Sequence, residues 1–177
     1  MKALVVYGTR SGATKQIADE IGKTLEEQGY ATTVRDAKQT NDLRAQDFDL
    51  VIVGSSIWAT MWKRQTMGFL KRNRKALAGK KVALFSSGLA GGDPAQAGYA
   101  RKSVEKVAAK FPEIRPISMA CFGGLVDFDS PNFLARFMAG AMKKDFEKKG
   151  VDTSKPVDTR DWAAIRQWAE DVAVKAR

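Results

Sequence analysis

The sequence contains no histidine, and its only cysteine is Cys121. Without histidine the chain has no Ser-His-Asp triad, no histidine general base and no histidine-ligated metal. A single thiol also excludes an internal disulfide, a cysteine-ligated zinc site and an iron–sulfur cluster held by this chain alone, and it is compatible with a reducing compartment. We therefore expect no metal site, and we expect any redox chemistry to come from a bound hydride or electron carrier.

Long hydrophobic runs are missing as well. The N-terminal segment turns polar soon after Val6, and no apolar stretch approaches the roughly 20 residues that a membrane-spanning helix needs. We therefore expect neither a Sec-type signal nor a transmembrane helix. The expected location is the cytoplasm, with a peripheral position on the inner face of the membrane as the alternative.

Acidic residues are outnumbered, with 20 Asp and Glu against 30 Lys and Arg and a formal net charge of +10. Such an excess favours an anionic partner: a carboxylate- or phosphate-bearing ligand, an acidic membrane surface or nucleic acid. No nucleic-acid-binding motif supports the last of these, so we expect no nucleic acid partner. The 177 residues, 44% hydrophobic and 28% charged, are typical of one globular domain, which we place over 1–177.

Short apolar runs alternate with helical spacing along the chain. Strands are predicted at 3–7, 32–35, 50–54, 81–86 and 114–121, and helices at 14–28, 69–76, 97–111, 133–149 and 161–176. This alternation indicates a three-layer α/β sandwich, with a five-stranded parallel sheet covered by helices on both faces. The unbroken apolar runs at 4–7, 50–53 and 82–85 place those strands in the middle. Pro116 lacks a backbone donor and therefore indicates an edge strand or a strand start.

The strongest local signal is a hydroxyl-rich turn between the first strand and the first helix. It consists of Thr9, Arg10, Ser11, Gly12, Ala13 and Thr14. Hydroxyls and backbone N–H groups at the start of a helix form a cradle for an anion, and the helix dipole assists them. The turn also follows a strand of an open α/β sheet, where such folds bind ligands. It predicts a phosphate site, and an ordinary helix cap with a Ser/Thr turn is the alternative.

This T-x-S-G-x-T turn resembles the phosphate loop of flavodoxins, which bind FMN non-covalently. Two further strand exits resemble the flavin-flanking loops of that family: Ser55, Ser56, Ile57 and Trp58, and then Ser87, Gly88, Leu89, Ala90, Gly91, Gly92 and Asp93. The resemblance covers 1–121 and implies the strand order 2-1-3-4-5. It also implies one FMN, with its phosphate at 9–14 and its ring between the two loops. The residues alone leave two alternatives: Trp58 and Trp62 as a hydrophobic pair at the start of a helix, and the glycines as a plain turn.

Shorter motifs resemble the HemG-type, quinone-dependent protoporphyrinogen IX dehydrogenases. They are Gly98-Tyr99-Ala100-Arg101-Lys102, Phe122-Gly123-Gly124-Leu125-Val126-Asp127, Arg136-Phe137-Met138 and Asp158-Thr159-Arg160-Asp161-Trp162. This resemblance implies oxidation of protoporphyrinogen IX, a tetrapyrrole of heme biosynthesis, with FMN as the first acceptor and a quinone as the final oxidant. The basic charge departs from electron-carrier flavodoxins, which are typically acidic. A carrier and an NAD(P)H-dependent FMN quinone reductase remain the alternatives.

The segment at about 122–149 is a basic helical insertion relative to a flavodoxin core. Its helix carries an apolar sector made of Phe133, Leu134, Phe137, Met138, Ala141 and Met142. We expect Arg136, Lys143 and Lys144 to bind either the carboxylates of an anionic substrate or an anionic membrane. The alternative is a helix that packs on the sheet and has a solvated face.

No catalytic side chain is assigned, because the resemblance leaves the chemistry to N5 of the flavin. Asp93 and Asp127 are the candidate proton acceptors. The sequence predicts no oligomeric state.

Overall fold

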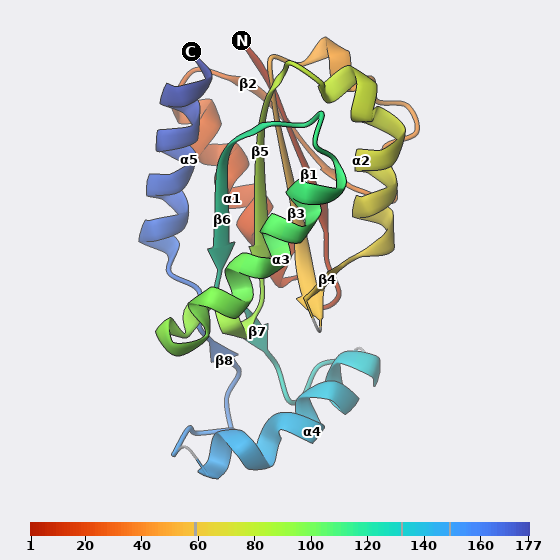
Figure 1. Ribbon diagram of the computed structural model, residues 1–177. Helices are drawn as coiled ribbons and strands as arrows, with labels where there is room; N and C mark the ends of the chain where they lie inside the picture. Colours follow the sequence, from red (N-terminus) through yellow and green to blue (C-terminus); the bar gives the residue numbers. More distant parts are fainter. Residues whose placement is uncertain (59, 132, 149) are drawn as a thin grey trace.

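The structure, a computed structural model, describes residues 1–58, 60–131, 133–148 and 150–177. A central sheet carries helices on both faces, and one further helix lies beyond the carboxyl ends of the strands (Figure 1). One face carries α1 (Ala13–Glu27) and α5 (Trp162–Ala176), the other carries α2 (Arg64–Leu77) and α3 (Ala97–Lys110), and the outlying helix is α4 (Phe133–Lys148). The predicted three-layer sandwich is confirmed, with α4 outside its layers.

The sheet has five parallel strands. They are β1 (Lys2–Gly8), β2 (Ala31–Asp36), β3 (Leu50–Trp58), β5 (Lys81–Ser87) and β6 (Pro116–Phe122). Their order is β2-β1-β3-β5-β6, which is the predicted order 2-1-3-4-5 when only the parallel strands are counted. Pro116 is the first residue of β6, and β6 is an edge strand, so both positions predicted for this proline hold.

Short elements connect and extend this frame. They are the 3₁₀ turns η1 (Ala45–Asp47), η2 (Leu89–Gly92) and η3 (Pro94–Gln96), the strand β4 (Met61–Trp62), and the antiparallel pair β7 (Leu125–Val126) and β8 (Val157–Asp158). None of them was predicted from the sequence. A strand of two residues is too short to show the alternation of apolar and polar side chains. These strands are therefore defined only by their pairing with other strands in the folded chain.

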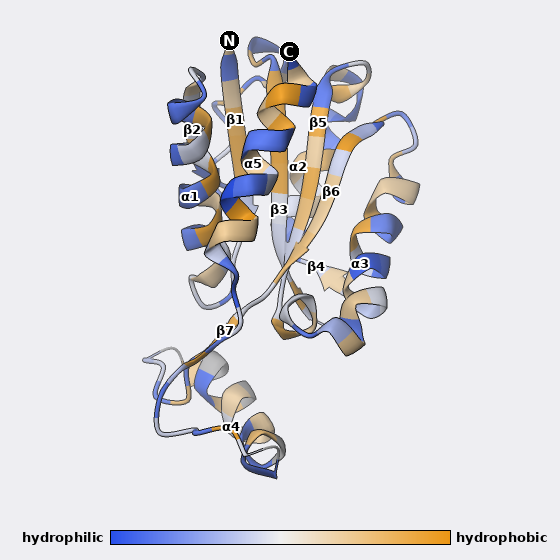
Figure 2. Cartoon of the chain, turned by 90° about the vertical axis from the view of Figure 1, so that its left-hand side faces the viewer, coloured by the Kyte–Doolittle hydropathy of each residue, from blue (hydrophilic) through white to orange (hydrophobic). Residues whose placement is uncertain are grey.

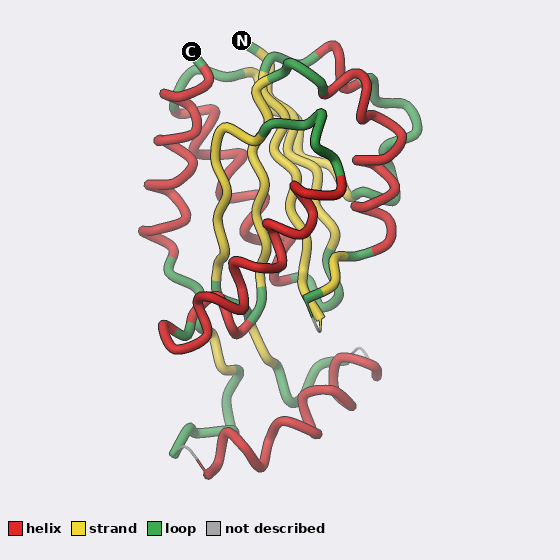
Figure 3. The backbone as a smooth tube through the Cα atoms, in the orientation of Figure 1, coloured by secondary structure: helices red, strands yellow, loops and turns green. Residues whose placement is uncertain are grey.

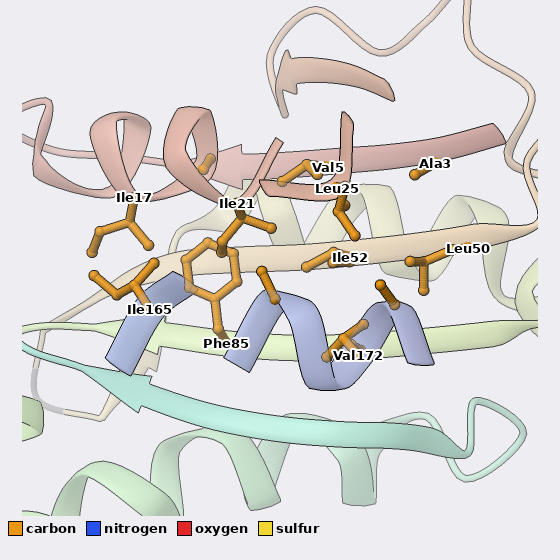
Figure 4. Packing of buried hydrophobic residues seen from close by; sticks show 14 of the residues in the cluster. Ala3, Val5, Ile17, Ile21, Leu25, Leu50, Ile52, Phe85, Ile165 and Val172 are labelled. Carbon is orange, nitrogen blue, oxygen red and sulfur yellow. The ribbon is translucent and has the colours of Figure 1, made fainter. Parts of the chain in front are cut away.

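The strands divide their side chains between two core clusters. In β1, Ala3 and Val5 face α1 and α5, whereas Leu4 and Val6 face α2 and α3, as the period of two in a strand requires. Figure 4 shows the first cluster, where apolar side chains of α1 and α5 meet those of the central strands. Figure 2 shows β3 losing its hydrophobic colour toward its carboxyl end. The apolar core therefore gives way to polar residues at one edge of the sheet.

The end of β3 departs from the prediction. The segment 55–58 was expected to be a loop, and Trp58 and Trp62 were alternatively a pair at a helix start; both expectations are wrong. β3 continues through Trp58 and turns back into β4, so that Trp58 lies opposite Met61. β-Branched and aromatic residues such as Ile57 and Trp58 favour a strand, and β4 supplies the partner that the sheet no longer offers there.

The chain between β7 and β8, residues 125–158, forms what we call the α4 arm. Figure 3 shows that it leaves the sheet region through β7, carries α4 across the end of the molecule and returns through β8. The expectation that α4 packs on the sheet is wrong, because α4 lies beyond the strand ends. No helix within the described ranges is both long and apolar enough to span a bilayer.

The apolar sector predicted for α4 is divided in the structure. Phe133 and Phe137 are 73% and 68% exposed, and their rings stack at 6.5 Å between centroids. Met142 is half-buried, and Ala139, which was not placed in the sector, is buried. The side chains of Leu134 and Met138 lie outside the described residues. The arm therefore presents apolar surface to the outside as well as to the molecule.

Candidate functional site

A cavity of about 480 Å³ lies at the carboxyl edge of the sheet. Its wall is formed by the turn after β1, the end of β3, the turn after β5 and parts of the α4 arm. Of the predicted cofactor-binding residues, it is lined by Thr9, Arg10, Ser11, Ala13, Thr14, Ser56, Ile57, Trp58, Ser87, Gly88, Leu89 and Ala90. The volume falls in the usual range of small-molecule sites, about 300–1,000 Å³. The structure thus brings the three predicted segments to one site.

The other predicted cofactor-binding residues do not line this cavity. They are Gly12, Ser55, Gly91, Gly92 and Asp93. Ser55 is fully buried, and its Oγ accepts a hydrogen bond from the backbone N–H of Lys63 at 2.8 Å. Asp93 Oδ1 accepts from the N–H of Ala95 at 2.9 Å where η3 begins. These two side chains shape the backbone of the loops around the cavity.

The turn after β1 is held open by one glycine. Gly12 begins α1 with a φ of 94°, in the left-handed region that other residues rarely adopt, and its N–H donates to Thr9 Oγ1 at 2.9 Å. No side chain of the described residues caps this end of α1. The first N–H groups of the helix therefore have no intrahelical acceptor and are available to an anion.

A buried pair of hydroxyls joins two of the segments. Thr14 Oγ1 and Ser87 Oγ lie 2.8 Å apart, and both side chains are buried. Thr14 belongs to the first turn of α1, and Ser87 is the last residue of β5. This hydrogen bond fixes the start of α1, after β1, to the end of β5, which lies beyond β3 in the sheet.

Three cationic side chains line the cavity: Arg10, Lys38 and Lys63. None of the three makes an ion pair within the described residues. Burial lowers the pKa of Lys63, and the charges of Arg10 and Lys38 lower it further, although Asp36 opposes them. This part of the site therefore carries positive charge that nearby carboxylates do not balance.

Lys38 and Lys63 were not predicted as site residues. Lys38 follows β2 and Lys63 follows β4, so each comes directly after a strand that ends near the site. The rule that ligands bind at the carboxyl ends of parallel strands could have found Lys38. Lys63 was hidden because β4 was not predicted.

The α4 arm contributes a part of the wall. Leu125, Val126, Asp127, Ala139 and Met142 line the cavity. The three basic residues predicted to bind substrate or membrane lie elsewhere, since Arg136, Lys143 and Lys144 are exposed and do not line it. Among the two candidate proton acceptors, Asp127 lines the cavity, whereas Asp93 does not.

The return of the arm is fixed to the sheet by close backbone packing. Gly124 and Thr159 make two hydrogen bonds: Thr159 N–H donates to Gly124 O at 2.9 Å, and Gly124 N–H donates to the side-chain Oγ1 of Thr159 at 3.0 Å. Gly91 approaches the backbone of Phe122 so closely that a Cβ would collide with it, and Gly92 approaches Thr159 in the same way. Gly91 therefore packs on the end of β6 and Gly92 on the residue that follows the arm, and neither lines the cavity.

Arg160 forms a second anchor at the return of the arm. Its side chain is only 5% exposed and pairs with the Asp158 carboxylate at 2.7 Å. It also donates to Gln16 Oε1 at 2.5 Å and lies 4.5 Å over the ring of Trp162. Because Gln16 is in the second turn of α1, Arg160 ties the arm to the helix that begins at the anion cradle.

The flavodoxin domain family model matches residues 4–154. The chain belongs to this family. Among curated proteins, it is 24% identical over 173 residues to the protein named protoporphyrinogen IX dehydrogenase (quinone) from Escherichia coli K12, covering 98% of this chain and 95% of the relative. A protein of the same name from Leishmania major is 27% identical over 182 residues, covering 97% and 74%.

Solved flavodoxins share the fold. The flavodoxin of Streptococcus pneumoniae TIGR4 superposes with a TM-score of 0.59 at 18% sequence identity, over 99% of this chain and 99% of that one. Together with the family match, this likeness indicates that the present flavodoxin domain binds FMN.

The residues in the cavity fit FMN. Ser56 Oγ is buried in the wall of the cavity and has no hydrogen-bond partner within the described residues, so it is a polar group that a ligand can satisfy. The uncapped start of α1 and the cationic side chains suit the phosphate. Ile57, Trp58 and Leu89 supply apolar surface for a flat ring. The site of this flavoprotein therefore has a polar part that suits the phosphate and an apolar part that suits the ring.

Proposed function

We propose that this protein is an FMN-dependent oxidoreductase that takes electrons from protoporphyrinogen IX, or a similar reduced substrate, and passes them to a quinone. Two relatives that span nearly the whole chain are named for this reaction. The observation that carries the proposal is the composition of the cavity wall, to which the arm adds Leu125, Val126 and Met142. This apolar addition suits a large flat substrate, and methionine adapts well to such a surface.

In this proposal the protein binds and orients FMN and the substrate, and the cofactor supplies the redox chemistry. Ser11, Thr14 and the start of α1 would hold the phosphate of FMN, while Ile57 and Trp58 would flank its ring. Bound FMN supplies a two-electron acceptor, which no side chain of this chain can supply. The apolar wall excludes water and holds the substrate against the ring. Asp127, a carboxylate that lines the cavity, would accept the proton.

The exposed face of α4 is the proposed contact for anionic groups outside the cavity. Arg136, Lys143 and Lys144 are exposed on the same helix as the stacked Phe133 and Phe137. A helix that exposes both cations and apolar rings suits an anionic membrane surface, where a quinone also resides, and the same cations suit substrate carboxylates. We therefore include a peripheral membrane contact in the proposal.

An anaerobic turnover panel tests this function. The purified protein, loaded with FMN, is supplied with protoporphyrinogen IX and menadione, with NADPH and menadione, or with a ferredoxin reductase as the electron source. We expect turnover only in the first mixture. Turnover with NADPH and menadione would identify a quinone reductase instead, and reduction only by ferredoxin reductase would identify an electron carrier.

A further inference from the structure

We propose that Lys63, assisted by Arg10 and Lys38, is a phosphate-binding residue that makes this site select a phosphorylated flavin over an unphosphorylated one. The inference rests on the proposed function only in that FMN is the ligand. It assigns to the cavity a cationic phosphate contact in addition to the hydroxyls and N–H groups of the turn.

The position of Lys63 is set by the hairpin at the end of β3. Its backbone N–H is held by Ser55 Oγ at 2.8 Å. Its Cβ and Cγ lie 3.1 and 3.3 Å from the point that a Cβ on Gly8 would occupy. Gly8 is the last residue of β1 and directly precedes the phosphate turn. The stem of Lys63 therefore lies against the strand end at the turn. A Cβ at position 8 would collide with Thr66 Oγ1 and would also crowd this stem, so glycine there leaves room for both side chains.

Among the residues that the structure describes, no carboxylate forms an ion pair with Lys63, although the charge of Asp36 acts on it. Other cations of this chain pair with carboxylates, as Lys15 does with Asp19 and Arg166 with Glu20. In the described residues, Lys63 has no such pair, although it is half-buried.

Charged side chains from three segments act on or lie near Lys63. Arg10 comes from the turn after β1, Lys38 from the loop after β2, and Asp36 from the end of β2. Burial is the main cause of the lowered pKa of Lys63, and the two neighbouring cations add to it. A bound dianion would raise the pKa of Lys63 and so offset the lowering by these two cations, whereas a neutral ligand would not.

The chemistry of the surroundings favours a phosphate over a carboxylate. The uncapped start of α1 offers several N–H donors, and Ser11 lines the same cavity. A phosphate monoester has three terminal oxygens and a charge near −2, so it can use the helix donors and several cations together. A carboxylate has two oxygens and one charge, and leaves part of this donor set unused.

Flavin titration separates this role from a structural one. We compare the wild type, Lys63→Gln, Lys63→Arg and the control Lys75→Gln, which changes an exposed lysine in the last turn of α2. FMN and riboflavin are titrated by quenching of flavin fluorescence at low and at high salt. We expect Lys63→Gln to raise the Kd for FMN about tenfold at low salt and less at high salt. The Kd for riboflavin should not change, and Lys63→Arg should retain most of the FMN affinity.

The other outcomes are decisive as well. Equal weakening of FMN and riboflavin would show that Lys63 only packs on Gly8, and unchanged FMN binding by Lys63→Gln would exclude the phosphate contact; both overturn this inference and leave the proposed function standing. Failure of the wild type to bind FMN would overturn both. A loss of FMN affinity in Lys75→Gln equal to that in Lys63→Gln would reduce the effect to net charge and overturn the inference too.

Discussion

The two parts of the cavity wall are built in opposite ways. The part around the phosphate turn grows from central strands whose apolar residues are fully buried, and the Thr14–Ser87 bond fixes it internally. The part contributed by the α4 arm is reached through β7 and β8, and its helix exposes Phe133 and Phe137. The first part is pre-organised for a constant cofactor. The second offers adaptable apolar surface, which suits a substrate, a quinone or a membrane.

The largest effect should come from the rigid part. Ser11→Ala with Thr14→Ala removes two hydroxyls from the phosphate turn, and the second change also removes the hydroxyl that Ser87 Oγ contacts. We expect a loss of FMN affinity of about 1.5–3 kcal/mol for each charge-assisted bond removed. Fluorescence titration with FMN measures it. If the double variant binds FMN as the wild type does, the phosphate lies elsewhere.

Charge reversal on α4 should affect only the functions assigned to the α4 arm, and not FMN binding. The triple variant Arg136→Glu, Lys143→Glu and Lys144→Glu should keep its FMN affinity, because none of the three residues lines the cavity. Binding to anionic vesicles, or turnover of a carboxylated porphyrinogen, should weaken by about 1 kcal/mol for each contact, and less at high salt. Vesicle binding and turnover that do not change at low salt would reduce α4 to a structural helix and favour an electron carrier.

The connection between the two parts can be loosened at Arg160. Arg160→Ala removes the partner of Asp158 and the bond to Gln16, and we expect a loss of about 2 kcal/mol in the free energy of unfolding at pH 7. Hydrogen bonds from Arg160 lower the pKa of Asp158. The stability from this pair is therefore present above the ordinary pKa of aspartate, about 3.9, and is lost as the pH falls through the lowered value.

Urea denaturation at neutral and at acidic pH measures this effect of Arg160. The difference between wild type and variant should shrink when the pH falls below about 4. A difference that stays constant with pH would assign the loss to the packing of Arg160 on Trp162 instead.

The smallest effect should be the pH dependence of FMN binding. Because the pKa of Lys63 is lowered, this ammonium loses its proton at a lower pH than an ordinary lysine does. FMN affinity should therefore fall as the pH rises through that pKa, by less than about tenfold, and Lys63→Gln should not show this step. Titrations from neutral to alkaline pH measure it. An identical pH profile in the variant would exclude Lys63 as the titrating group.

The sequence predicted the part of the molecule that local patterns determine. The apolar runs of β1, β3 and β5 revealed the sheet, and the hydroxyl-rich turn revealed one end of the cavity. The α4 arm was predicted as a basic helical insertion, but the antiparallel pair of β7 and β8 that carries it beyond the layers was not, because these strands are too short to show a period. Lys63 was missed for a related reason: its position depends on the hairpin of β3 and β4, and so on a pairing across the chain.

The bond between Thr14 and Ser87 has a consequence for the direction of hydrogen donation. In the structure either hydroxyl can be the donor. A phosphate dianion has acceptor atoms only, so a Thr14 hydroxyl that donated to it would have to accept from Ser87, and the pair would then have a single polarity. Each donor in such a chain strengthens the next. In the proposed site, binding of the phosphate would therefore select one of the two proton arrangements and orient both hydroxyls, from the first turn of α1 to the end of β5.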